Sequence, residues 1–263
     1  MTGTNLATYV LREGAGVPVV LLHGFPLDHR MWVPVADLIP EGVRVVAVDL
    51  PGHGHSDLGQ TPETMEAAAD AVHATLRHHG EGNVVVVGLS MGGYVALALA
   101  ERHPDLVHGL GLVDTKSTAD TAEARAGRLD VARAVHDSQT LDAVMGMPAK
   151  LLGATSELER RALYPTVEAW VRSQHPSGVV WAQRAMAARG DRTHVLTEFD
   201  GPVAVVVGAE DRVTPVEDAK HMAAAARDVT LTVVPNAAHL STVEEPGAVA
   251  TAIFDLHGRA TRR

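Results

Sequence analysis

NVVVVGLSMGGYVALALAER, residues 83–102, is the stretch that decides the fold. Its run of valines has the length and the β-branched character of a buried strand. The Ala- and Leu-rich residues that follow favour a helix. Between the two lies Gly88-Leu89-Ser90-Met91-Gly92, a G-x-S-x-G pattern. In this strand–turn–helix setting the pattern predicts a nucleophile elbow, although the pattern alone also fits an ordinary Gly-rich turn.

A serine at such a turn needs neighbours without bulk, because the tight turn strains its backbone. Gly88 and Gly92 meet that need. The turn lifts the Ser90 hydroxyl above the sheet edge, at the N-terminus of a helix. Backbone N–H groups and the helix dipole favour developing negative charge there.

Strand-like and helix-like segments alternate on both sides of this stretch. Further strands are expected at residues 17–22, 43–48, 107–113, 202–207 and 230–234, with a short one at 6–11 that could form an abbreviated antiparallel hairpin. Helices are expected at about 31–39, 62–79, 91–102, 216–226 and 246–257. The alternation predicts an α/β fold, with a mostly parallel central sheet and helices on both faces.

The alternation breaks once, between Asp114 and Pro202, where only helical patterning interrupted by Gly and Pro is found. We expect residues 116–194 to form a helical lid, inserted into a core domain made of residues 1–115 and 195–263. The insertion begins at the C-terminal end of a strand, where open α/β sheets bind ligands. A structural extension of the helical layer is the alternative.

Composition narrows the range of partners and compartments. The 263 residues carry a formal net charge of −10 and no long cluster of Lys and Arg, which disfavours a nucleic-acid partner. The chain has no cysteine, so it forms neither disulfides nor thiolate metal sites. We see neither a signal peptide nor an apolar stretch long enough to span a membrane, and therefore expect a cytoplasmic protein without a membrane partner. We expect it to be a monomer or a homodimer.

A nucleophilic serine needs a base and an acid that orients it. His239 follows the last expected strand, so its loop reaches the same sheet edge as Ser90. Asp211 follows the preceding strand, which gives the chain order Ser, Asp, His. Glu210 and Asp114 are alternative acids, because Asp114 also ends a strand at that edge.

The oxyanion hole of acyl transfer is expected from backbone N–H groups. Phe25 follows the strand at 17–22, and Met91 follows Ser90, so their N–H groups can converge on one oxygen. Gly24 permits the close approach, and His23 is expected to support the loop.

An apolar substrate wall is expected in the lid and in the loop after Phe25, with packing inside the lid as the alternative. Its candidate residues are Leu27, Trp32, Met145, Met147, Trp170 and Trp181. A metal site at His53 and His55 is disfavoured, because the sequence offers no carboxylate cluster beside them at ligand spacing. No metal and no cofactor is implied.

Several separated motifs resemble the α/β-hydrolase superfamily over residues 17–257. They are His23-Gly24-Phe25-Pro26-Leu27-Asp28, Asp49-Leu50-Pro51-Gly52-His53-Gly54-His55-Ser56, Gly88-Leu89-Ser90-Met91-Gly92-Gly93, Gly208-Ala209-Glu210-Asp211 and Ala238-His239. Within the superfamily the chain looks similar to 3-oxoadipate enol-lactonase-like esterases and cofactor-free haloperoxidase-like hydrolases. The resemblance disfavours haloalkane dehalogenases and epoxide hydrolases, which place Asp where this chain has Ser90.

The sequence therefore predicts a serine hydrolase that cleaves a carboxylic ester or lactone of a small organic substrate through an acyl-enzyme. Three alternatives remain open on the same scaffold: hydrolysis of a carbon–carbon bond, lyase or cyclase chemistry, and a non-catalytic small-molecule receptor.

Overall fold

The computed structural model describes residues 6–262 and contains a seven-stranded sheet. The strand order is β1-β3-β2-β4-β5-β6-β7. All neighbouring strands are parallel except β1, which runs antiparallel to β3. The strands are β1 (Thr8–Arg12), β2 (Gly14–Leu22), β3 (Gly42–Val48), β4 (Val84–Leu89), β5 (Val107–Val113), β6 (Val203–Gly208) and β7 (Val229–Val234).

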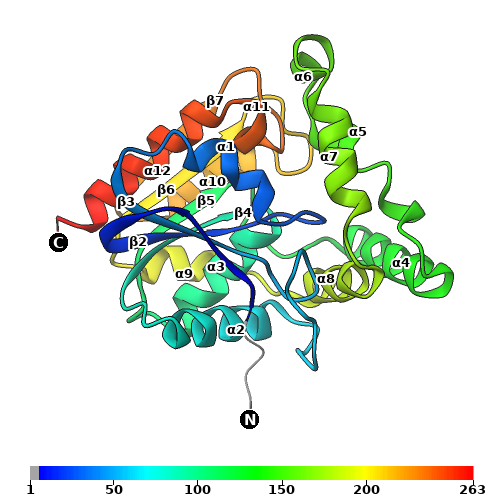
Figure 1. The fold of residues 1–263 in the computed structure, drawn as a ribbon, viewed down its shortest axis with the longest axis horizontal. Helices are drawn as coiled ribbons and strands as arrows, with labels where there is room; N and C mark the ends of the chain where they lie inside the picture. The colour runs from blue at the N-terminus through cyan, green and yellow to red at the C-terminus, as the bar shows by residue number, and fades with distance from the viewer. Residues whose placement is uncertain (1–5, 263) are drawn as a thin grey trace.

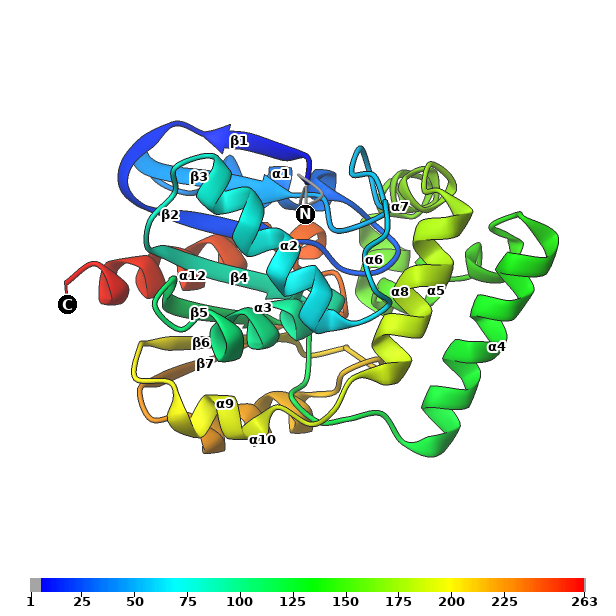
Figure 2. The same ribbon diagram turned by 90° about the horizontal axis from the view of Figure 1, so that it is seen from below.

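Helices cover both faces of the sheet (Figures 1 and 2). One face carries α2 (Met65–His78), α3 (Met91–Arg102), α9 (Thr193–Glu198) and α10 (Val216–Ala225). The other carries α1 (Val33–Ala36) and α12 (Pro246–Ala260), with the short α11 (Ser241–Glu244) beside them and the 3-10 helix η1 (His29–Trp32) leading into α1. The α/β fold class expected from the sequence is confirmed.

The first strand differs from its expectation. It spans Thr8–Arg12 and pairs with β3, in the register Thr8 to Val48, rather than forming a hairpin with β2. The reason is topological: β3 lies between β1 and β2 and pairs with both. Its pairing with β2 extends from Gly14 opposite Gly42 to Leu22 opposite Val48.

The central strands are buried on both faces, which explains their continuous aliphatic sequences. Every residue of β4 and β6 is buried, and their valines pack against the helices on either side. Burying one such side chain contributes about 1.5–3 kcal/mol. None of the described helices is long and apolar enough to cross a membrane.

Residues 116–194, all of them described, hold helices and loops without a strand. These helices are α4 (Ala122–Ser138), η2 (Asp142–Val144), α5 (Pro148–Leu151), α6 (Ala154–Glu159), α7 (Leu163–Arg172), α8 (Pro176–Ala188) and the start of α9. The chain leaves the sheet after β5 and returns at β6, and α4 packs along α8 beyond the carboxyl ends of the strands (Figure 2). We refer to this segment as the insertion.

Candidate active site

Ser90 lies at the turn between β4 and α3, in a strained conformation. Its φ of 54° and ψ of −112° lie in a region that side chains other than Gly rarely adopt. The turn closes because its glycines lack a Cβ: one on Gly88 would clash with the backbone of Gly92, and one on Gly92 with the backbone of Leu22. Any larger residue at either position would push the elbow out of shape.

A hydrogen-bonded chain runs from Ser90 to a buried acid. The Ser90 Oγ lies 2.9 Å from His239 Nε2, and His239 Nδ1 lies 2.8 Å from an oxygen of Asp211. His239 and Asp211 are buried, whereas Ser90 is half-buried and faces a cavity. With Nδ1 donating to Asp211, the unprotonated Nε2 is left to accept the Ser90 proton.

Asp211 is held as an ionised acceptor. One of its oxygens accepts the N–H groups of Val213 (2.7 Å) and Thr214 (3.1 Å), and the other accepts the Thr214 hydroxyl (2.9 Å) as well as His239. Burial by itself would raise its pKa, but attraction to His239 and these donors outweigh burial and lower it. Conversely, burial would lower the pKa of His239, and attraction to Asp211 raises it overall.

The alternative acids take part in other contacts. Asp114 accepts the Gly208 N–H (2.8 Å) and both the N–H (3.2 Å) and hydroxyl (2.6 Å) of Ser241. Burial, and then repulsion from Asp211, raise the pKa of Asp114 to about 8. Glu210 accepts the backbone N–H and the hydroxyl of Thr155, in the insertion.

Two backbone N–H groups flank Ser90. Met91 is the first residue of α3, so its N–H has no partner within the helix. Within residues 6–262 the Phe25 N–H has no hydrogen-bond acceptor either, and Phe25 lines the cavity beside Ser90. His23 fixes the Phe25 loop: its Nδ1 donates to Gly24 O (2.9 Å) and its Nε2 accepts the Leu50 N–H (2.8 Å).

The cavity at Ser90 has a volume of about 160 Å³ and is closed on one side by the insertion. Its lining residues are Phe25, Ser90, Tyr94, Lys116, Asp120, Ala124, Arg128, Met147, Leu151, Met186, Val213, Thr214 and His239. The proposed nucleophile and base therefore share this cavity with apolar side chains and with three charged ones, Lys116, Asp120 and Arg128.

Known proteins share this architecture and are similar to this chain in sequence. The family model of the alpha/beta hydrolase fold matches residues 17–246. The chain belongs to the α/β-hydrolase fold family. This membership confirms the resemblance seen in the sequence, and with it the class of an esterase-type hydrolase.

Three relatives illustrate the range of this family. The pimeloyl-[acyl-carrier protein] methyl ester esterase of Chromobacterium violaceum is 32% identical, over 88% of this chain and 90% of its own length. A thermophilic esterase from Thermogutta terrifontis, solved with malate bound, is 34% identical, with a TM-score of 0.91 over 97% of this chain and 93% of its own. The enol-lactonase of Burkholderia xenovorans LB400 has a TM-score of 0.85 over 98% of both chains at 24% identity, and so supports the fold alone.

In this α/β-hydrolase only one residue of the expected apolar wall, Met147, lines the cavity at Ser90. Leu27, Trp32 and Trp181 are fully buried in the core, and the Trp181 indole N–H donates to the carbonyl groups of residues 61 and 62. Trp170 and Met145 are partly buried against the core, with the Arg30 guanidinium 6.0 Å from the Trp170 ring. These five residues therefore pack in or against the core instead of lining the cavity, and two of them, Leu27 and Trp32, lie outside the insertion.

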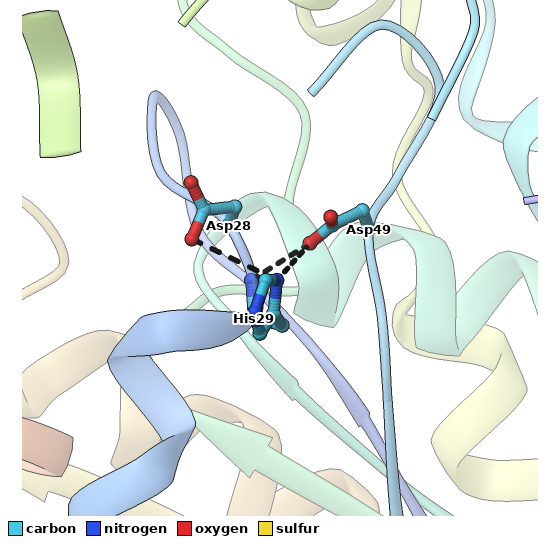
Figure 3. A group of neighbouring side chains, drawn as sticks. All are labelled: Asp28, His29 and Asp49. Atoms are coloured by element: carbon cyan, nitrogen blue, oxygen red, sulfur yellow. Dashed lines mark hydrogen bonds and ion pairs between the residues drawn. The ribbon is translucent and has the colours of Figure 1, made fainter. Parts of the chain in front are cut away.

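A carboxylate cluster does lie beside the His53–His55 loop, contrary to what the sequence suggested. Asp28, His29 and Asp49 offer ligand atoms within 4.8 Å of one another (Figure 3). The sequence concealed the cluster because Asp28 and Asp49 follow different strands. Protein groups already supply hydrogen bonds to both carboxylates.

Asp28 accepts the backbone N–H and guanidinium of Arg30 and the amide of Gln174. Asp49 accepts the N–H and ring Nδ1–H of His29 and the N–H of His55. We interpret the cluster as structural: its hydrogen bonds hold the loop after β2 against the loop after β3.

Sequence reasoning missed the charged side of the cavity. Lys116, Asp120 and Arg128 lie in the insertion, and nothing in the local pattern of Asp120 and Arg128 distinguishes them from solvated surface charges. Lys116 offered one signal, since it follows the end of β5 at the edge where Ser90 lies.

Proposed function

We propose that this protein is a serine hydrolase that cleaves a carboxylic ester or lactone of a small organic substrate through an acyl-enzyme. One observation carries the proposal: the hydrogen-bonded chain Ser90–His239–Asp211 ends at a cavity, with hydrogen bonds of 2.9 and 2.8 Å. Ser90 is the nucleophile, His239 the general base, and Asp211 orients and stabilises the imidazolium.

The chemistry has two half-reactions. His239 Nε2 takes the Ser90 proton as Oγ attacks the carbonyl carbon, and the Phe25 and Met91 N–H groups stabilise the oxyanion. His239 then gives the proton to the leaving alkoxide, so the C–O bond breaks and the acyl group stays on Ser90. Water attacks the acyl-enzyme by the same route and releases the acid, restoring Ser90.

We also propose that the insertion acts as a lid over this site and sets substrate size. Met147, Leu151 and Met186, all from the insertion, line the cavity together with Tyr94 of the core. At about 160 Å³ the cavity is smaller than the roughly 300–1,000 Å³ usual for ligand pockets, which favours a short acyl group.

The relatives support ester cleavage, because two that are more than 30% identical are named esterases. Lactone cleavage is the same acyl transfer on a cyclic ester, so it belongs to the same proposal. Carbon–carbon bond hydrolysis, lyase or cyclase chemistry and a receptor function remain the alternatives, each to be separated by experiment.

The test is hydrolysis of p-nitrophenyl acetate and butyrate, together with labelling by a fluorophosphonate probe. We expect wild type to turn over and to be labelled, Ser90→Ala to lose both, and Ser138→Ala, an exposed serine at the end of α4, to retain both. Wild-type turnover that persists in Ser90→Ala would overturn the assignment of the nucleophile. Labelling without turnover of any ester or lactone would favour lyase chemistry. If the wild-type protein shows neither turnover nor labelling, the result would favour a receptor function.

A further inference from the structure

One buried carboxylate in the insertion is surrounded by three cations beside the cavity of Ser90. Asp120 lies in the loop before α4, and its side chain is 3% exposed. It accepts hydrogen bonds from the Arg128 Nε–H (2.6 Å) and the Arg189 Nη2–H (2.9 Å). It also forms ion pairs with Arg189 Nη1 (2.8 Å) and Lys116 Nζ (3.4 Å). One negative charge therefore faces three positive ones.

Asp120 stays ionised in this surrounding. Burial would raise its pKa, but hydrogen bonds from Arg189 and Arg128 outweigh burial and lower it. Its single charge balances Arg189, which is 2% exposed and lies 4.0 Å from the Tyr94 ring. The Arg189 guanidinium also donates to carbonyl oxygens of residues 118 and 186. Arg189 therefore has a structural position behind the cavity wall.

Arg128 and Lys116 differ from Arg189, because both line the cavity and keep donors available. Apart from Asp120, Arg128 contacts the thioether sulfur of Met186 (3.2 Å), a weak acceptor. In the part of the chain that the structure describes, Lys116 makes only its 3.4 Å ion pair with Asp120. Their side chains are 23% and 19% exposed, so both are partly withdrawn from solvent.

The nearby acids do not cancel this charge at the cavity. Asp211 directs its oxygens to His239, Thr214 and the Val213 N–H. Asp218 attracts Lys116 but forms no ion pair with it within residues 6–262, and it is not a lining residue. The side of the cavity formed by Lys116 and Arg128 therefore carries excess positive charge.

We propose that Lys116 and Arg128 form a carboxylate subsite, so that the preferred substrate is an ester or lactone carrying a second carboxylate, such as a half-ester of a short dicarboxylic acid. This inference rests on the proposed function. A guanidinium and an ammonium supply the directed donors that a carboxylate needs, and partial burial strengthens the pairing. The cavity volume of about 160 Å³ limits the substrate to a short chain between the two carbonyl groups.

The decisive comparison is monoethyl succinate against ethyl levulinate, in which a methyl ketone replaces the carboxylate at similar size. We expect wild type to prefer the half-ester by at least ~10-fold in kcat/KM, mostly through KM. Arg128→Gln and Lys116→Met should each reduce that preference by roughly tenfold. Arg125→Gln, an exposed arginine on the same helix, should leave it unchanged.

A binding measurement separates this inference from the proposed function. Succinate binding to Ser90→Ala, measured by calorimetry, should weaken by roughly tenfold on adding Arg128→Gln and stay unchanged on adding Arg125→Gln. Ser90-dependent hydrolysis without preference for the half-ester would overturn the subsite and leave the esterase intact. If no ester is cleaved but succinate binding depends on Arg128, the proposed function fails and the subsite stands. If circular dichroism shows that Arg128→Gln is unfolded, the same binding measurement on Lys116→Met tests the subsite.

Discussion

His239 and Asp211 are joined by a 2.8 Å hydrogen bond in which the imidazole Nδ1–H faces a carboxylate oxygen. Replacing Asp211 by Asn keeps the shape but presents an NH₂ group or an uncharged oxygen to Nδ1. The imidazole then loses both its tautomer and its counter-charge. We expect Asp211→Asn to lower kcat by roughly 10³–10⁴-fold, with little change in unfolding temperature. Steady-state kinetics with p-nitrophenyl butyrate measure the fall in kcat.

The matched control is Asp114→Asn, which tests the alternative acid. Asp114 bonds to Gly208 and Ser241, and no hydrogen bond joins it to His239 among the described residues. We therefore expect a loss of kcat of less than roughly tenfold, through a small shift of the Ser241 loop. A loss in Asp114→Asn as large as in Asp211→Asn would assign the acid to Asp114 instead.

The pH profile should report the imidazole. The pKa of His239 is raised by Asp211, and only the unprotonated ring can accept the Ser90 proton. Activity should therefore fall as pH drops through a midpoint above the ordinary value of about 6.5. In Asp211→Asn the residual activity should have its acid limb at lower pH, because the attracting charge is gone. The log of kcat/KM against pH for both proteins gives the midpoints, and an unmoved limb would contradict this coupling.

Stability should depend on pH through Asp114, whose pKa is raised to about 8. The folded state retains this proton while the unfolded chain releases it near pH 4, so this group favours folding less as pH rises from about 4 to 8. The effect is at most ~1.4 kcal/mol per pH unit. Asp114→Asn lacks it, so the unfolding temperature of the variant relative to wild type should increase between pH 5.5 and 8. Parallel curves would show that Asp114 is ionised at neutral pH.

The sequence predicted the sheet, and it singled out three residues that the structure brings together, because both depend on local patterns. Valine runs mark strands buried on two faces, and the glycines around Ser90 mark a turn without room for side chains. Asp211 and His239 each follow a strand, so parallel topology alone brings them to the edge of Ser90. The roles of these residues await the kinetics above.

What the sequence could not predict depends on packing between distant segments. Trp32 and Trp181 look like pocket residues because they are large and apolar, yet each is almost completely buried in the core. Lys116 and Arg128 look like solvated charges, yet both line the cavity at Ser90. Lys116 lies there because it follows β5, and Arg128 because α4 packs along α8. In both pairs the residue type suggests one location and the packing of distant segments gives another.

Glu244 links the insertion to the loop of His239 and leads to the last prediction. Its side chain is buried; one oxygen accepts the Ala238 N–H (2.9 Å), and the other accepts the Gly153 N–H (2.8 Å) and the Ser156 hydroxyl (2.6 Å). His239 N–H in turn donates to Leu151 O (3.1 Å). The base is thus positioned partly by the insertion.

Replacing Glu244 by Gln turns an acceptor into an NH₂ donor that faces N–H groups. We expect Glu244→Gln to lower the free energy of unfolding by about 1–3 kcal/mol and to reduce kcat more than it raises KM, because the imidazole shifts. Glu245→Gln removes a partly exposed partner of Arg160 and should cost less than about 1 kcal/mol. Denaturant unfolding and steady-state kinetics on both variants test this prediction. A loss of stability without a fall in kcat would show that Glu244 stabilises the insertion but does not position His239.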